Sequence, residues 1–329
     1  MKATICIAAL FAQALFAWGI EEDSLTMALV RGADVNIGIR VVDDEGAPVV
    51  DAECCGWIYL ERDAKHGCRY SATTDTNGAF RIVGKSSEWV SVNVSKEGYY
   101  ESQEKIVYPD MSCASPVVDG KWQPYGEMRT VVLKRIKKPG RCVIPKQGGQ
   151  FAWNIPAFGE WIGFDFEEFD WTSPYGRGKS KDVILKFQGK CNKRYVDYEY
   201  EMDVCFTNHP YAGAYVCDLA GYSDFKTQYR ADTNGVFQTS FQFVLKKSST
   251  QRVTECVEQN QYLVFRTRTK VGDDGKMKAA HYGALLGMWS FSDKQMSVGD
   301  ACFNIVENDT NIEDGRTLRD KIKNYAKKK

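Results

Sequence analysis

The stretch TTDTNGAFRI, from Thr73 to Ile82, decides how the first half of the chain is read. Six of its residues return almost unchanged as DTNGVF, from Asp232 to Phe237. A calcium loop needs an acidic residue two positions before the Asp and a Glu six positions after the Gly, and both copies lack them. An Asp followed three residues later by a Gly instead predicts a type I turn, with the Gly left-handed, closing a β-hairpin. The flanks of the two copies do not align, which favours convergent turn chemistry over a duplicated domain.

Alternating residues on both sides of the first copy predict short β-strands. In residues 35–41 and 90–95 every second residue is Val or Ile, and the others are polar, charged or Gly. Residues 52–60 also form a predicted strand, so the adjacent Cys54 and Cys55 should face opposite sides. Residues 128–136 are the predicted closing strand. Short strands separated by Gly-rich turns predict an antiparallel sandwich.

The first 19 residues have the pattern of a secretory signal peptide. Lys2 supplies a positive charge, residues 5–17 are apolar, and the small residues Ala17 and Gly19 fit a cleavage site. The apolar run is too short for a bilayer span, and no later stretch approaches the roughly 20 apolar residues that a span needs. The mature chain is therefore predicted to be secreted or periplasmic, without a membrane span.

Charge and cysteine content narrow the possible partners and ligands. The chain has 43 basic and 43 acidic residues, so no net field would attract nucleic acid. Of its 11 cysteines, Cys6 leaves with the signal peptide, and the even remainder predicts disulfides or buried thiols in an exported protein. No C-x-x-C motif occurs, and His66, His209 and His281 are scattered. We therefore expect no metal site and no cofactor.

A basic segment rich in Pro and Gly, residues 138–150, predicts a linker between two domains. The first domain is placed at residues 25–137 and a second β-rich, sandwich-like domain at residues 151–315. Helical spacing of apolar residues occurs only near the C-terminus, so residues 316–329 are predicted to form a short basic helical tail. Strand patterns resume in the second domain at residues 182–188, 195–206, 237–245 and 262–270.

Three motifs of the first domain occur in a recognisable order. VVDDEGAPVVDAE (Val41 to Glu53) is a strand and turn, TTDTNGAFRI follows, and VSVNVSKEGYY (Val90 to Tyr100) ends in Gly-Tyr. In this order they resemble the carboxypeptidase regulatory-like family, although the Cys-bearing segment from Trp57 to Ser71 departs from it. The resemblance implies a transthyretin-like or immunoglobulin-like β-sandwich with no catalytic residues of its own.

Two motifs of the second domain also suggest a resemblance. GFDFEEFDWTSPYGRG (Gly163 to Gly178) and NDTNIEDG (Asn308 to Gly315) are similar to the C-terminal part of secreted bacterial proteins. This resemblance implies no particular activity.

The segment from Phe151 to Trp171 is the first candidate binding site. It places Trp153, Trp161 and Trp171 among five carboxylates. Aromatic rings can stack on the apolar faces of sugars, and suitably spaced carboxylates can hydrolyse glycosidic bonds. The same pattern is also typical of a core strand with an acidic edge, which is the favoured interpretation.

A second candidate is the aromatic pair on the predicted strand 52–60. Trp57 and Tyr59 are two residues apart, so both are expected to point away from the first core. The second domain, the loop from Glu61 to Gly67, or a glycan stacked on the two rings would then cover them.

Basic residues form a third candidate in the second domain. Arg266, Arg268 and Lys270 are predicted to share one strand face, with Lys276 and Lys278 returning beside them. The favoured interpretation is a solvated sheet face, and the alternative is an anion-binding stripe.

Neither a G-x-S-x-G nor an H-E-x-x-H motif occurs in the sequence. The sequence therefore favours a non-enzymatic, extracytoplasmic binding or structural module, whose partner would be a glycan or a cell-surface protein. The alternative is a carbohydrate-active protein that binds or hydrolyses polysaccharide through Phe151 to Trp171. Exposure of the tryptophans distinguishes them, because core rings are buried and sugar platforms are open.

Overall fold

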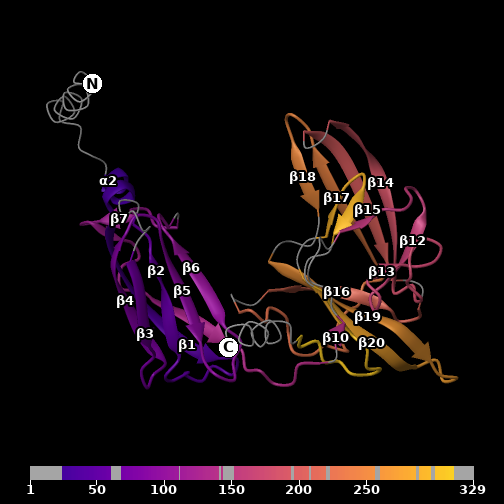
Figure 1. The fold of residues 1–329 in the computed structure, drawn as a ribbon, viewed down its shortest axis with the longest axis horizontal. Coiled ribbons are helices and arrows are strands. Elements are labelled where there is room, and N and C mark those ends of the chain that lie inside the picture. The colour runs from indigo at the N-terminus through magenta and orange to yellow at the C-terminus, as the bar shows by residue number, and fades with distance from the viewer. Residues whose placement is uncertain are drawn as a thin grey trace, which may run out of the picture. The chain divides into compact units, whose positions relative to one another are not determined.

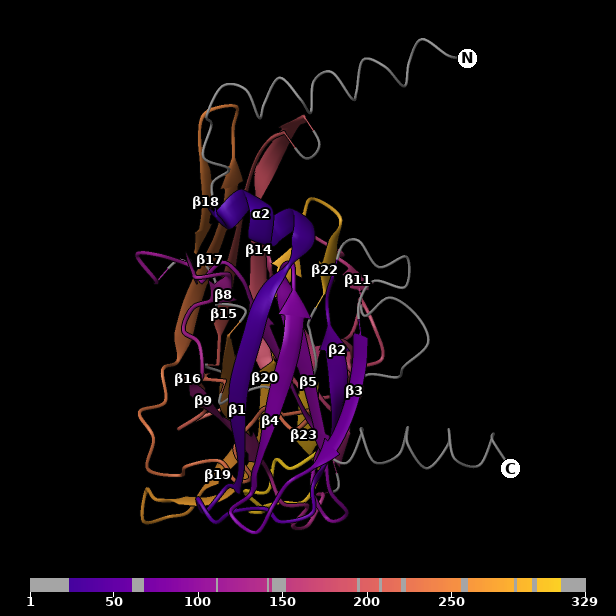
Figure 2. The ribbon, with the colours of Figure 1, turned by 90° about the vertical axis from the view of Figure 1, so that its left-hand side faces the viewer.

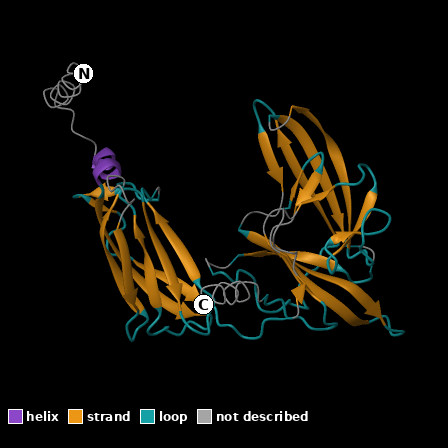
Figure 3. Cartoon of the chain, viewed as in Figure 1, coloured by secondary structure: helices purple, strands orange, loops and turns teal. Residues whose placement is uncertain are grey.

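The fold of the chain is all-β (Figure 3). The computed structural model divides into two compact units: unit 1 runs to Arg135 and also contains Ser223 and Asp224, and unit 2 comprises the remainder (Figure 1). The predicted signal peptide, residues 1–19, and basic tail, residues 316–329, lie outside the described residues. The structure describes residues 24–60, 68–110, 112–140, 142–143, 152–193, 196–206, 209–219, 223–255, 260–286, 289–297 and 301–314.

Two sheets pack face to face in unit 1. The first sheet has the order β4-β1-β8-β7, with β9 also paired to β1, and the second has the order β3-β2-β5-β6. β1 and β4 lie side by side in Figure 2 and pair antiparallel, whereas β8 and β9 pair parallel with β1. The strands are β1 (Ala33–Asp43), β2 (Glu53–Ile58), β3 (Cys68–Thr73), β4 (Ala79–Ser86), β5 (Trp89–Ser95), β6 (Ser102–Val107), β7 (Val117–Val118), β8 (Lys121–Trp122) and β9 (Met128–Leu133).

The core of unit 1 lies between these two sheets, as the alternation of residues predicts. The inward Val and Ile side chains of β1 and β5 are all buried, and each such burial stabilises the fold by roughly 1.5–3 kcal/mol. Cys54 is buried and Cys55 is half-buried, which confirms that they face opposite sides of β2.

Unit 1 also contains a helix that the sequence analysis did not predict, α2 (Ser24–Arg31). Leu25, Ala28 and Leu29 pack against the core of the sandwich. Gly32 ends the helix with a φ of +79°, and its N–H donates to the carbonyl of Ala28 at 2.8 Å. This is the left-handed C-terminal cap that glycine provides.

The two DTNG stretches form turns, but the prediction that each closes a hairpin is wrong. In each turn the Asp side chain accepts the N–H of the Asn, at 2.9 Å in both copies. The first turn joins β3 to β4, which belong to different sheets, and the second leads into β17 (Ser240–Lys247), which pairs with β15 and β18. Gly78 has a φ of +72°, as predicted, whereas Gly235 keeps a φ outside the left-handed region.

The first turn is tied to β1. The Val41 N–H donates to the Gly78 carbonyl at 2.7 Å, and a Cβ on Gly78 would lie 2.4 Å from the Val41 carbonyl oxygen. The neighbouring DDEGAP turn is organised by Asp43, whose carboxylate accepts the N–H groups of Glu45 and Ala47. Glycine at position 78 is therefore required by both conformation and space.

The described residues of unit 2 form three sheets. Their strand orders are β13-β12-β14-β15-β17-β18, β10-β23-β20-β19-β16 and β11-β22-β21. The six-stranded sheet comprises β12 (Trp161–Asp165), β13 (Asp170–Trp171), β14 (Val183–Lys193), β15 (Asp197–Cys205), β17 and β18 (Arg252–Glu255). The others comprise β10 (Cys142–Val143), β11 (Ala152–Asn154), β16 (Gly213–Asp218), β19 (Gln261–Val271), β20 (Met277–Leu286), β21 (Ser290–Phe291), β22 (Gln295–Ser297) and β23 (Ala301–Asn304).

The four strands predicted for the second domain overlap β14, β15, β17 and β19, so those predictions are confirmed. The main core of unit 2 is rich in phenylalanine, because inward positions of several strands and their connecting loops supply rings to one cluster. Its fully buried rings include Phe164, Phe166, Phe187, Phe206, Phe265 and Phe303.

The start of unit 2 is held by Glu313. Its carboxylate accepts the N–H groups of Lys137 at 2.9 Å and Lys138 at 2.7 Å, and its carbonyl accepts the N–H of Gly140. Asn311 adds a hydrogen bond from its side-chain amide to the Lys138 carbonyl. Within the predicted linker, residues 138–150, Lys138 and Gly140 are thus hydrogen-bonded to Glu313. The linker also contains strand β10, which pairs with β23.

Three further predictions concern disulfides, metal sites and membrane spans. No disulfide joins two of the cysteines whose side chains the structure describes, so the disulfide prediction remains a prediction. The described residues contain no group of three or more His, Cys, Asp or Glu side chains placed to hold a metal ion. Within the same part of the chain, no helix has the length and apolar character of a bilayer span.

Candidate functional site

The three tryptophans of the segment from Phe151 to Trp171 do not form one surface. Trp171 is buried and donates its indole N–H to the Asn154 carbonyl at 2.8 Å. Trp153 is half-buried, and its indole N–H donates to the Phe169 carbonyl at 2.7 Å. Trp161 is open to solvent, with 48% of its surface exposed. The first two rings belong to the core, so Trp161 is the one open tryptophan of the three.

The five carboxylates of this segment all have partners within the chain. Glu168 pairs with Lys179, and Asp170 pairs with Arg177. Glu160 accepts the Tyr175 hydroxyl at 3.3 Å, and the remaining two, Asp165 and Glu167, pair with Arg268. This pairing favours the interpretation of a core strand with an acidic edge.

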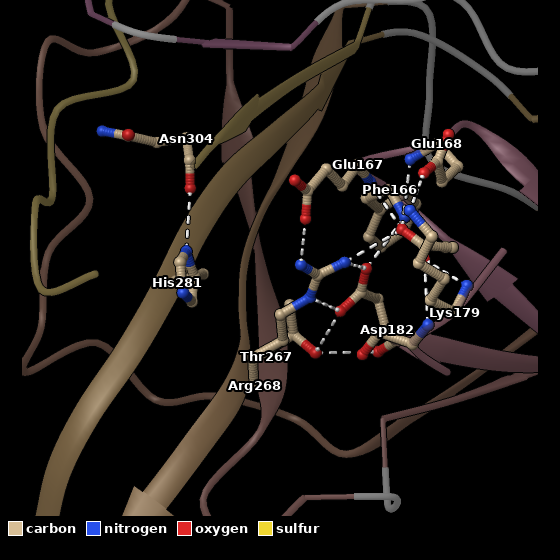
Figure 4. A network of polar contacts seen from close by, with 11 residues as sticks. Phe166, Glu167, Glu168, Lys179, Asp182, Thr267, Arg268, His281 and Asn304 are labelled. Carbon is tan, nitrogen blue, oxygen red and sulfur yellow. Dashed lines mark hydrogen bonds and ion pairs between the residues drawn. The ribbon is translucent and has the colours of Figure 1, made fainter. Parts of the chain in front are cut away.

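Arg268 is the centre of a buried ion-pair network (Figure 4). Its Nε and Nη2 donate to the two carboxylate oxygens of Asp182 at 2.8 and 2.9 Å, and Nη2 also donates to Asp165 at 2.9 Å. The guanidinium lies 4.7 Å from the ring centroid of Phe303, and Glu167 closes the network at its exposed side. Arg268 thus ties β19 to the loops around β12 and β14.

The pKa values of the two buried acids of this network, Asp165 and Asp182, are shifted in opposite directions. Burial raises the pKa of Asp165, but four backbone N–H groups, those of Ser180, Lys179, Glu168 and Glu167, bind the carboxylate and bring its pKa below the ordinary value. Burial raises the pKa of Asp182, and its bonds to Arg268 offset only part of that shift. The donors that surround these acids hold loops together, which indicates a structural network.

The basic stripe predicted on β19 is not a single face. A register shift between Thr267 and Lys270 marks a bulge, and Arg268 within it has a φ of +51°. Arg266 lies over the Phe237 ring, with its guanidinium carbon 3.9 Å from the ring centroid, whereas Arg268 turns into the buried network. Two of the three other cations are paired with acids: Lys270 with Glu307, and Lys278 with Asp274. The prediction of a solvated stripe is therefore wrong for Arg268.

Trp57 lies on the outward face of β2, as the alternation predicts, and Tyr59 stands just beyond the last residue of that strand. Trp57 is 40% exposed. Tyr59 is stacked against Trp89 of β5, with ring centroids 5.1 Å apart and an interplanar angle of 15°. The neighbouring strand therefore covers one face of Tyr59, and Trp57 carries the open ring.

Polar side chains flank these rings on neighbouring strands. Trp57 pairs with Arg69 of β3, and its N–H donates to the Ser91 hydroxyl of β5 at 3.0 Å. Ser91 in turn pairs with Lys105 of β6, so one row of residues crosses all four strands.

The next row of residues contains Ser71, Cys55, Asn93 and Gln103. We call the outward face formed by Trp57, Tyr59, Trp89, Arg69, Ser91 and Lys105 the aromatic face.

Trp89 is the third ring of the aromatic face, and the sequence analysis missed it. It stands two residues before Ser91 in the alternation of β5, so the same period that places Ser91 outward also places Trp89 outward. The Lys105 ammonium lies 4.7 Å from the centroid of the Trp89 ring. What the sequence does not contain is the pairing of β2, β5 and β6, which brings these residues together.

Comparisons with known proteins add little to this geometry. No protein-family model matches the chain, and no curated protein matches it. Among solved structures it is similar to 3-chlorocatechol 1,2-dioxygenase from Rhodococcus opacus 1CP, with a TM-score of 0.26 and 14% identity over 32% of this chain and 61% of that chain. Hydroxyquinol 1,2-dioxygenase from Pseudomonas putida DLL-E4 gives a TM-score of 0.25 and 15% identity over 33% and 59% of the two chains. The match spans less than two thirds of each dioxygenase, and a likeness of this size shows no shared activity.

Proposed function

We propose that this protein is an extracytoplasmic binding module, without catalytic activity of its own, that holds a glycan on the aromatic face of unit 1. The observation that carries the proposal is the open ring of Trp57, which stands beside the Tyr59–Trp89 stack on the outward face of a sheet. An aromatic ring exposed on a strand offers a flat apolar surface to the apolar face of a pyranose.

The surroundings of Trp57 also suit a sugar. A sugar ring has hydroxyl groups around its edge, and these need hydrogen-bond donors and acceptors. The row next to Trp57 supplies the amide groups of Asn93 and Gln103 and the hydroxyl of Ser71. Strand pairing fixes the backbone positions of these groups on one sheet, so binding does not require the backbone to become ordered.

The test is retention of glycans by the mature protein and by two matched variants. Trp57→Ala removes an exposed tryptophan ring of unit 1, and Trp161→Ala removes an exposed tryptophan ring of unit 2. On a glycan array, Trp57→Ala should weaken binding to the retained glycan by about tenfold or more, which corresponds to about 1.4 kcal/mol. Trp161→Ala should bind like the parent.

Three outcomes contradict the proposal. Loss of binding in Trp161→Ala alone would place the glycan on the segment from Phe151 to Trp171, as the alternative holds. Absence of any retained glycan, with the melting temperature of Trp57→Ala lowered, would make Trp57 a structural residue. Release of reducing sugar ends from the retained glycan would show hydrolysis instead of binding alone.

A further inference from the structure

The two DTNG stretches contain the only Asn-Gly pairs of the sequence, at Asn77 and Asn234. In such a pair the backbone nitrogen of the Gly can reach the side-chain carbonyl of the Asn, because Gly has no Cβ to block the approach. The four residues are identical in both copies, so the local sequence gives the two asparagines nearly the same intrinsic reactivity. A large difference in reaction rate between them must therefore come from the fold.

The first copy is held closed by hydrogen bonds on both sides of the Asn-Gly peptide. The Gly78 N–H donates to the Asp75 carbonyl at 2.9 Å, and the Asp75 carboxylate accepts the Ala79 N–H at 2.8 Å. The Gly78 carbonyl accepts the Val41 N–H of β1 at 2.7 Å, and Gly78 is buried. Attack by the Gly78 nitrogen requires the Asn77–Gly78 peptide to rotate, and this rotation disturbs all three hydrogen bonds.

The second copy holds the same peptide loosely. The Gly235 N–H donates to the Asp232 carbonyl at 3.3 Å, which is longer than the usual limit of about 3.2 Å. Among the described residues, the Asp232 carboxylate accepts the Asn234 N–H but not that of Val236, whose side chain is 85% exposed. Within that same part of the chain, no backbone group of Gly235 bonds to a neighbouring strand, as the Gly78 carbonyl does. The Asn234–Gly235 peptide can therefore rotate with the loss of one long hydrogen bond.

We infer that Asn234 is a site of spontaneous deamidation in the folded protein and that Asn77 is protected from it. The Gly235 nitrogen, after losing its proton to solvent, attacks Cγ of Asn234. A bond forms between this nitrogen and Cγ, the bond from Cγ to the side-chain nitrogen breaks, and that nitrogen takes up a proton and leaves as ammonia. Water then opens the cyclic imide to aspartate or isoaspartate. Water is the only co-reactant, and nothing is oxidised or reduced.

Deamidation changes the turn that leads towards β17. Either product places a new carboxylate two residues after Asp232, and isoaspartate also adds one carbon to the backbone. Phe237 and Gln238 follow directly. The Phe237 ring centroid lies 3.9 Å from the Arg266 guanidinium carbon, and Gln238 exchanges backbone hydrogen bonds with Ala214. A longer backbone moves both residues away from these partners, so the modification loosens this edge of unit 2.

The experiment is prolonged incubation of the mature protein at neutral pH, below its melting temperature, in isotopically labelled water. Peptide mapping by mass spectrometry then detects the labelled oxygen in each new carboxyl group. The same chain in denaturant measures the intrinsic reactivity, and there the two asparagines should react at similar rates. In the folded protein Asn234 should react at least about tenfold faster than Asn77, because each additional hydrogen bond makes local opening rarer.

Two matched variants test the assignment through the total release of ammonia. Asn234→Gln should remove most of the ammonia released by the folded protein, whereas Asn77→Gln should leave the release nearly unchanged. Equal labelling of the two sites in the folded protein, or faster labelling of Asn77, would overturn the inference. It would also be overturned if neither site were labelled in the folded protein during the time in which both react in denaturant.

Discussion

Substitution of Gly78 by Ala tests the turn that joins the two sheets of unit 1. The backbone of Gly78 is left-handed, and an Ala side chain there costs roughly 1–2 kcal/mol for conformation alone. The added Cβ would also lie 2.4 Å from the Val41 carbonyl oxygen and 3.1 Å from the Val49 nitrogen, both backbone atoms of packed segments. Relief of such a clash costs roughly a further 1–3 kcal/mol. The expected total is about 2–5 kcal/mol.

Gly46 supplies the matched control for this substitution. It has a φ of +84° in the same unit, but a Cβ there would meet no atom within 4 Å. Gly46→Ala should therefore lose only the conformational part, roughly 1–2 kcal/mol. Calorimetry of the mature protein measures both, since each kcal/mol should lower the melting temperature of unit 1 by about 4 °C. Equal destabilisation by the two substitutions would refute the steric argument, and no destabilisation by either would refute the conformational one.

Three further results are expected. Arg268→Met should destabilise unit 2 by about 3–5 kcal/mol in calorimetry, because Asp182 would remain buried without its cation. Lys270→Met breaks an exposed ion pair and should cost less than about 1 kcal/mol. Similar losses of stability in the two variants would contradict the structural role of the network. Asp165 has a lowered pKa in the folded state, so its stabilising contribution is present above its unfolded pKa of about 3.9 and is lost as the pH falls through the folded value. The difference in unfolding free energy between the parent and Asp165→Asn should accordingly be largest near neutral pH and shrink below about pH 4, and a gap that widens on acidification would show the opposite shift. Trp57→Ala should leave the melting temperature within about 2 °C of the parent, since the ring is open, and a larger fall would favour a structural role.

Four strands of unit 1, namely β1, β2, β5 and β9, could be predicted because residues on their buried side alternate with residues on the other side. The alternation in residues 35–41 and 90–95 survives in β1 and β5 without a shift. Pairing between strands could not be predicted, because a turn such as DTNG fixes the chain only locally. The turn that contains Gly78 therefore connects two different sheets. The turn that contains Gly235 has the same Asp–Asn hydrogen bond, but its glycine has a different backbone conformation.

The sequence analysis missed helix α2 and wrongly placed Arg268 in solvent, for different physical reasons. α2 has a sequence signal, since Leu25, Ala28 and Leu29 have helical spacing and Gly32 follows at the capping position. No local sequence signal marks the inward position of Arg268, because its side chain binds carboxylates that lie more than 80 residues away along the chain. The aromatic face lies between these cases: each member alternates as expected, but only strand pairing makes it a surface.

The bonds of Glu313 have a consequence for synthesis of the chain on the ribosome. The backbone of Lys137, Lys138 and Gly140 is satisfied by a residue made about 175 positions later, and β10 must wait for its partner β23. Domains fold as units during translation, and emerging chains expose unpaired strand edges. The first residues of unit 2 therefore leave the ribosome well before their partners exist. We expect nascent chains that stop before Glu313 to remain sensitive to protease at residues 136–143, and to gain protection once residues 301–313 have emerged.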